Sequence, residues 1–209
     1  MPDVLRRALL AFFLCPSLLM ADMQTRTGAA VPGWPGVAAT LERLYPGQRR
    51  MSGLVVSISQ QRLYRLQDGR VLESWPVSTS RYGAGSEAGS YRTPLGLHRV
   101  RERIGADLPE GAIISGRIPT GEVAELVQEP RATDDDLVTS RILWLEGLEP
   151  GLNQGEGVDS HARYIYIHGT HEEGLIGQPA SKGCIRMYNR DVIRLFDKTP
   201  SGTLVLILP

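Results

Sequence analysis

The residues with the clearest chemical potential are a cysteine and a histidine near the C-terminal end, Cys184 and His168. A thiol has an ordinary pKa of about 8.5, and a neighbouring imidazole or cation lowers it and so produces a nucleophilic thiolate. Lys182 and Arg186 flank the cysteine, and their positive charge would favour both a thiolate and a substrate carboxylate. The pattern predicts a cysteine nucleophile, resting as a thiolate near neutral pH, with His168 as its base.

The residue before the cysteine, Gly183, permits a tight turn that exposes backbone N–H groups. The N–H groups of Gly183 and Cys184 are therefore candidate donors to an oxyanion. However, a lone free cysteine is more often a small buried apolar residue than a nucleophile. A cysteine with a histidine elsewhere is only a candidate pair, so the residues alone leave both interpretations open.

The histidine ends a predicted strand over residues 164–168. Side chains alternate along a strand, so Tyr164, Tyr166 and His168 share one face while the intervening isoleucines point into a core. The chain then turns, which would allow Cys184 to return beside the end of this strand.

Most of the remaining chain is predicted to form short strands separated by turns, the pattern of a mostly β fold. Asp68-Gly69 predicts a type I′ hairpin, and Asn189 is expected to cap a helix that follows Cys184. The predicted strands cover residues 54–59, 62–66, 71–78, 97–100, 142–145, 164–168 and 203–208, and the predicted helices cover residues 38–45 and 189–198.

Several polar groups are assigned no chemistry. The glycine-rich loop over residues 83–96 lacks the lysine and the helix of a phosphate-binding loop. The three aspartates at residues 134–136 point in different directions, which predicts a solvated turn. His98, His161 and His171 have no identifiable partner and are expected to be structural or exposed.

Composition limits the class of protein. The 209 residues fit one domain with a sizeable core. Lys+Arg and Asp+Glu both number 23, so no net charge attracts nucleic acid or an anionic membrane surface. Cys15 and Cys184 make no disulfide framework, and the absence of any cysteine–histidine cluster with zinc-ligand spacing predicts no metal site.

The N-terminal residues 1–21 place two arginines before an apolar stretch that ends at Ala21. This arrangement predicts a secretory signal peptide or hydrophobic leader, and hence a location in the periplasm or cell envelope. A later start of the chain, with a cytoplasmic location, is the alternative.

A longer motif surrounds the two candidate residues. His168-Gly169-Thr170 is followed, after a spacer, by Ser181-Lys182-Gly183-Cys184-Ile185-Arg186-Met187. This arrangement resembles the signature of the L,D-transpeptidase (YkuD-type) catalytic domain, a His-Gly pair followed by Ser/Thr-His-Gly-Cys and a nearby Arg or Asn. The resemblance covers roughly residues 54–208 and departs at Lys182, where the family most often has histidine.

The resemblance implies a mostly β sandwich or distorted barrel with a short helix after the cysteine. It makes Cys184 the nucleophile, His168 the base and the Gly169 carbonyl the group that orients the imidazole. The residues that would line the substrate groove are Tyr166, Ser181, Lys182, Gly183 and Arg186. Among these, Lys182 could hold a substrate carboxylate.

The reaction implied by the family is attack on the third residue of a peptidoglycan stem peptide, with release of D-alanine. An amine then takes the acyl group from the thioester, without cofactor or metal. The alternatives are an L,D-carboxypeptidase, another thiol hydrolase, or a catalytically weak wall-binding module that Lys182 would favour. The expected organisation is a leader over residues 1–21, a linker and short helix over 22–50, and the catalytic domain over 51–209, in an oligomeric state that the sequence does not indicate.

Overall fold

The computed structural model describes residue 31 and residues 33–209, so the predicted leader and part of the predicted linker lie outside the described residues. The elements, in chain order, are α1 (Trp34–Leu44), η2 (Pro46–Gln48), β1 (Gly53–Ser57), β2 (Arg62–Gln67), β3 (Arg70–Pro76), β4 (Gly96–Ile104), β5 (Ala112–Ser115), β6 (Ile118–Val123), β7 (Val138–Gly147), β8 (Tyr166–Thr170), η3 (Glu173–Leu175), β9 (Ile185–Met187), α2 (Asn189–Asp197) and β10 (Leu204–Leu208).

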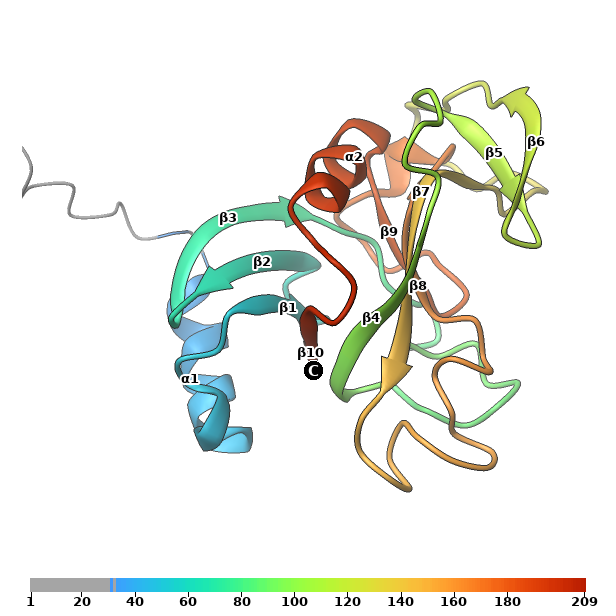
Figure 1. The fold of residues 1–209 in the computed structure, drawn as a ribbon. Helices are drawn as coiled ribbons and strands as arrows, with labels where there is room; N and C mark the ends of the chain where they lie inside the picture. The colour runs from blue at the N-terminus through green and yellow to red at the C-terminus, as the bar shows by residue number, and fades with distance from the viewer. Residues whose placement is uncertain (1–30, 32) are drawn as a thin grey trace, which may run out of the picture. The chain divides into compact units, whose positions relative to one another are not determined.

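The strands form one mixed sheet in the order β3-β2-β1-β10-β4-β7-β5-β6, with β8 beside β7 and β9 beside β8. Two pairs are parallel, β1 with β10 and β8 with β9. Strand β10, close to the C-terminus, lies between β1 and β4 and joins the two halves of the sheet (Figure 1).

Two apolar cores lie on opposite faces of β1, β2 and β10, because side chains alternate along each strand. On β1, Leu54 and Val56 point into the larger core, whereas Val55 points into the smaller core, which α1 covers with Val37 and Leu41. The larger core also contains apolar residues of β7, β8, β9 and α2, so both halves of the sheet enclose it. This arrangement confirms the predicted mostly β fold with a sandwich-like core and a short helix after Cys184.

The predicted hairpin is confirmed. Strands β2 and β3 pair in antiparallel fashion, and the turn residues Asp68 and Gly69 have φ angles of 50° and 77°, as a type I′ turn requires.

Other boundaries differ from the prediction. Strand β8 begins two positions later than expected, because Tyr164, with φ of 57°, still belongs to the preceding turn. Helix α1 begins earlier than expected, at Trp34. The middle of the chain contains a hairpin, β5 and β6, that the sequence did not reveal, because every residue of β6 is exposed and no apolar alternation marks it.

Within the described part of the chain, no helix has the length and apolar character needed to span a membrane.

The turn at Gly69 generates a prediction about stability. A Cβ atom there would lie 2.5 Å from the Arg49 carbonyl oxygen, and the φ angle already disfavours an L side chain. We expect Gly69→Ala to lower the free energy of unfolding by about 2 kcal/mol in urea titrations. The matched control is Gly47→Ala, since a Cβ at Gly47 meets nothing within 4 Å. Equal stabilities of the two variants would contradict this account.

Candidate active site

The parallel pairing of β8 and β9 brings the predicted residues together. Ile167 pairs with Ile185 and His168 with Arg186 in the register of these strands. Both isoleucines point into the larger core, so their neighbours along the strands face the opposite side. A cavity of about 100 Å³ lies on that side, lined by Asp136, Val138, Tyr166, His168, Ser181, Lys182, Cys184 and Arg186.

The Cys184 thiol is held between two backbone groups of the chain leading into β8. Its Sγ atom lies 3.3 Å from the Tyr164 carbonyl, to which it donates, and accepts from the Tyr166 N–H at 3.4 Å. Burial raises the pKa of the thiol to about 11, with Asp136 adding to the effect, while the Tyr166 N–H and nearby arginines oppose it. The thiol is therefore protonated at neutral pH in this arrangement.

His168 is buried at the same cavity. Its Nδ1 atom lies 2.7 Å from the Gly169 carbonyl oxygen, so the contact that the resemblance implied is present. If Nδ1 carries the proton for this bond, Nε2 is free to accept one. Burial lowers the imidazole pKa to about 4, against the opposing effects of the Gly169 carbonyl and Asp136.

These two shifts show that one expectation is wrong. The sequence predicted that neighbouring cations would keep Cys184 as a resting thiolate. Burial outweighs those cations, so the resting pair is a neutral thiol and a neutral imidazole. The chemistry this pair can perform is proton transfer from sulfur to imidazole as the sulfur attacks, rather than attack by a preformed ion.

The cations themselves are neutralised. Arg186, with a side chain only 2% exposed, pairs with Glu172 at 2.7 Å and also with Asp136. Lys182 lies 3.9 Å from the second oxygen of Asp136 and is half exposed. Burial raises the pKa of Asp136, but Arg186 and the other cations lower it further, so the carboxylate is ionised at neutral pH.

Asp136 is thus the site residue that sequence reasoning missed. All three aspartates are exposed, as predicted, but the Asp136 side chain, 30% exposed, pairs with Arg186 and lines the cavity beside His168, which the predicted turn without chemistry did not include. A signal was available, since an arginine on a strand that is buried on both faces requires a carboxylate partner. The sequence did not indicate which of many carboxylates would supply it.

The turn before the cysteine is fixed by Ser181. Its hydroxyl donates to the Cys184 carbonyl at 2.6 Å and accepts from the Gly183 N–H at 3.2 Å. Gly183 has φ of 123°, which explains the need for glycine there. An oxyanion role for the Gly183 N–H stays a prediction, and it would require this hydrogen bond to break.

Asn189 does not cap α2, because the N-cap is Tyr188 and no side chain caps the helix. The Asn189 amide is instead buried behind the site, where Oδ1 accepts from the hydroxyls of Thr139 and Ser140. Its Nδ2 donates to the Thr170 carbonyl at 2.8 Å. The residue therefore ties α2 to β7 and to the end of β8.

The other histidines have structural contacts, as predicted. His98 is fully buried and contacts the Gly96 carbonyl and the Ser160 hydroxyl. His171 contacts the Thr133 hydroxyl, and His161 stacks on a tryptophan ring. Among the residues that the structure describes, no cluster of histidine, cysteine or carboxylate side chains could hold a metal ion.

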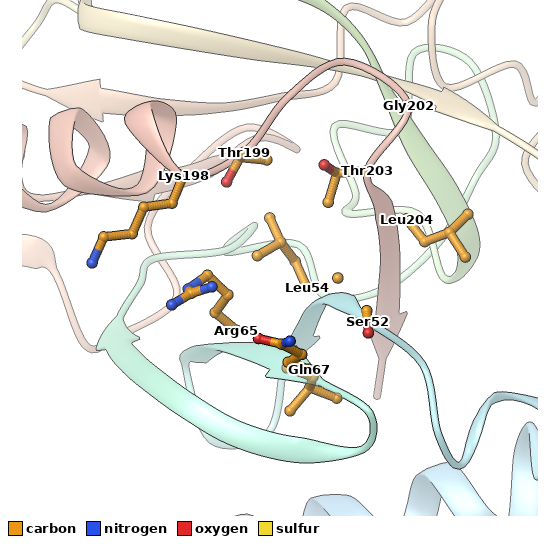
Figure 2. A pocket seen from close by; sticks show the side chains of 11 residues that line it. Ser52, Leu54, Arg65, Gln67, Lys198, Thr199, Gly202, Thr203 and Leu204 are labelled. Atoms are coloured by element: carbon orange, nitrogen blue, oxygen red, sulfur yellow. The ribbon is translucent and has the colours of Figure 1, made fainter.

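A larger hollow of about 350 Å³ lies elsewhere, at the β1–β10 pair (Figure 2). Its two cations, Arg65 and Lys198, share the carboxylate of Glu73. No cysteine or histidine lines it. Cavity size therefore does not locate the candidate active site, whereas the thiol–imidazole convergence does.

The comparisons with known proteins agree with this geometry. Residues 52–207 match the family model of the L,D-transpeptidase catalytic domain, YkuD. A protein of Bacillus licheniformis named as a candidate L,D-transpeptidase, YkuD, is 54% identical over 43 residues, which are 21% of this chain and 26% of that protein. Its namesake in Bacillus subtilis is 56% identical over 41 residues, 20% and 25% of the two chains. The chain thus covers about a quarter of the length of these curated relatives.

Among solved structures, the L,D-transpeptidase of Xylanimonas cellulosilytica (residues 123–326) is 23% identical, with a TM-score of 0.42 over 76% of this chain and 62% of that chain. The family model spans most of the described residues, and on that basis this chain belongs to the L,D-transpeptidase catalytic domain family.

The neutral resting pair generates a prediction about pH. Because the thiol pKa is raised to about 11, the thiolate fraction at pH 7 is of the order of 1 in 10,000. We expect the rate of Cys184 alkylation by iodoacetamide to rise roughly tenfold per pH unit from pH 6 to 10. Intact-protein mass spectrometry measures this rate. A plateau between pH 5 and 8 would instead indicate a resting thiolate.

Proposed function

We propose that this protein is a cysteine-dependent L,D-transpeptidase that acts on peptidoglycan stem peptides in the cell envelope. The observation that carries the proposal is the meeting of Cys184 and His168 at one cavity, on the strand pair that also forms the family signature. Family membership supports the class of reaction. The substrate, the leaving group and the location come from the resemblance.

The proposed first half-reaction begins when the substrate carbonyl approaches Sγ. The thiol proton passes to Nε2 of His168 as the C–S bond forms, and the Gly169 carbonyl together with the charge of Asp136 stabilises the imidazolium. The tetrahedral intermediate then collapses with cleavage of the C–N bond. The imidazolium returns the proton to the departing amine, which leaves as D-alanine.

The second half-reaction decides between two activities. When an amine attacks the thioester, His168 removes its proton, a new amide forms and the thiol is regenerated. When water attacks, the same steps release a free acid, which is L,D-carboxypeptidase activity. A wall-binding module without turnover is the candidate from a different class, favoured only by the departure from the family at Lys182.

The acyl-enzyme is tested with Cys184→Ala. A carbapenem should add one covalent adduct to the wild-type protein and none to the variant, and purified muropeptides should give cross-linked or trimmed products only with the wild type. Intact-protein and product mass spectrometry make both measurements. An adduct on the variant, or no change in the muropeptides with either protein, would argue against the proposal.

Lys182→His restores the residue most often found in the family. We expect turnover of stem peptides to be preserved or to rise by up to about tenfold, because an imidazole can still fill the space beside the thiol while Asp136 keeps its partner Arg186. Steady-state kinetics with Lys182→Gln as control measure the effect. Complete loss in Lys182→His, with Lys182→Gln active, would show that this position has another role.

A further inference from the structure

Three exposed or half-exposed residues, two of them beside the turn that carries Cys184, have backbone conformations that L residues rarely adopt. Tyr91, Arg117 and Tyr164 have φ angles of 56°, 71° and 57°. Non-glycine residues in this region are held there by their surroundings and cluster at functional sites. The Tyr164 carbonyl accepts the Cys184 thiol, and the Tyr91 carbonyl lies against Gly183. Tyr91 and Tyr164 thus have unusual backbone beside the turn that carries Cys184, and Gln61, Asp68 and Ser140 occupy the same φ region in other parts of the chain.

Arg117 lies at the turn between β5 and β6, the hairpin at the end of the sheet (Figure 1). Its guanidinium lies 4.9 Å from the centre of the Tyr164 ring and 5.1 Å from that of Trp144. It also interacts with Tyr166, which lines the cavity. The tip of the hairpin thus places a cation against Tyr164, the residue whose carbonyl accepts the Cys184 thiol.

Arg117 differs from the other cations near the site in the groups that its guanidinium contacts, although Arg163 likewise has no carboxylate within ion-pair distance among the described residues. Lys182 and Arg186 share Asp136, and the Arg163 guanidinium donates to backbone carbonyls, including that of Arg92 at 2.7 Å. Within residues 33–209, no carboxylate lies within ion-pair distance of Arg117. Its largest interaction is the side-chain hydrogen bond with Tyr166, and Glu102 is a carboxylate that acts on it through space.

The cations on the two sides of the thiol therefore differ in their partners. Lys182 and Arg186 are already paired with Asp136, while Arg117 offers a guanidinium that lies against two aromatic rings. A planar guanidinium binds a carboxylate through two parallel hydrogen bonds. Contact with the rings of Tyr164 and Trp144, together with the hydrogen bond to Tyr166, restricts the side chain in advance, so little further entropy is lost on binding.

We propose that Arg117 binds the C-terminal carboxylate of the residue that leaves during acylation, and so selects peptides with a free C-terminal acid. The inference rests on the proposed function, since it names how the same site recognises its donor peptide. It assigns the β5–β6 hairpin a role in specificity, with Tyr164 as the platform for the guanidinium.

The test compares a stem tetrapeptide with its C-terminal amide. We expect wild-type kcat/KM to be about 10- to 100-fold higher for the acid, the range for loss of a charge-assisted pair. Arg117→Gln should bring kcat/KM for the acid close to that for the amide measured with the same variant. Arg117→Lys should recover part of the preference. The inference would be overturned if Arg117→Gln kept the wild-type ratio of kcat/KM for the acid to kcat/KM for the amide. It would also be overturned if Lys182→Gln, rather than Arg117→Gln, lost the preference for the acid.

A binding measurement separates this inference from the proposed reaction. In the Cys184→Ala background, calorimetric titration of both peptides should show tighter binding of the acid, and Arg117→Gln should abolish the difference. If binding prefers the acid and this preference depends on Arg117, but the wild type shows no turnover, the proposed reaction is contradicted and the inference about Arg117 stands. If the wild type turns over the peptide but Arg117→Gln keeps the wild-type difference in affinity between the two peptides, only the inference about Arg117 is contradicted.

Discussion

The parallel register of β8 against β9 is the constraint on which the site depends. The pairing of Ile167 with Ile185 buries one face of both strands in the core. His168, Cys184 and Arg186 are thereby confined to the opposite face. A shift of one residue would bury the polar set and expose the isoleucines, so the apolar core itself fixes the relative position of thiol and imidazole.

Arg186 then determines what surrounds the thiol. A buried guanidinium is strongly destabilising without partners, and removal of one partner from such a pair commonly costs about 3–5 kcal/mol. Glu172 follows β8 and Asp136 precedes β7, so one side chain ties together three distant segments. Because these carboxylates cancel the local positive charge, the cations do not overcome the effect of burial on the thiol pKa.

The sequence predicted the parts of this molecule that depend on local patterns. Alternating apolar residues indicated β1, and Asp68-Gly69 indicated the hairpin of β2 and β3, because both signals lie within a few neighbouring residues. The motif around Cys184 led to the correct family, and its cysteine and histidine line one cavity. Asp136, Arg117 and the true contacts of Asn189 were missed, since each depends on which distant segment the fold brings beside it.

The protonated state of the Cys184 thiol has a consequence for the proposed reaction. Thiolates are the form that oxidants attack, so a protonated thiol reacts with them slowly even where its side chain is only partly buried. Burial keeps His168 neutral, and hence able to accept a proton, down to pH values well below 7. In the proposed reaction, the proton therefore has to move from sulfur to imidazole as the substrate carbonyl arrives. The rate of such a concerted step depends on how accurately the walls of the cavity position the peptide. Substrate specificity would then be determined by residues other than Cys184 and His168.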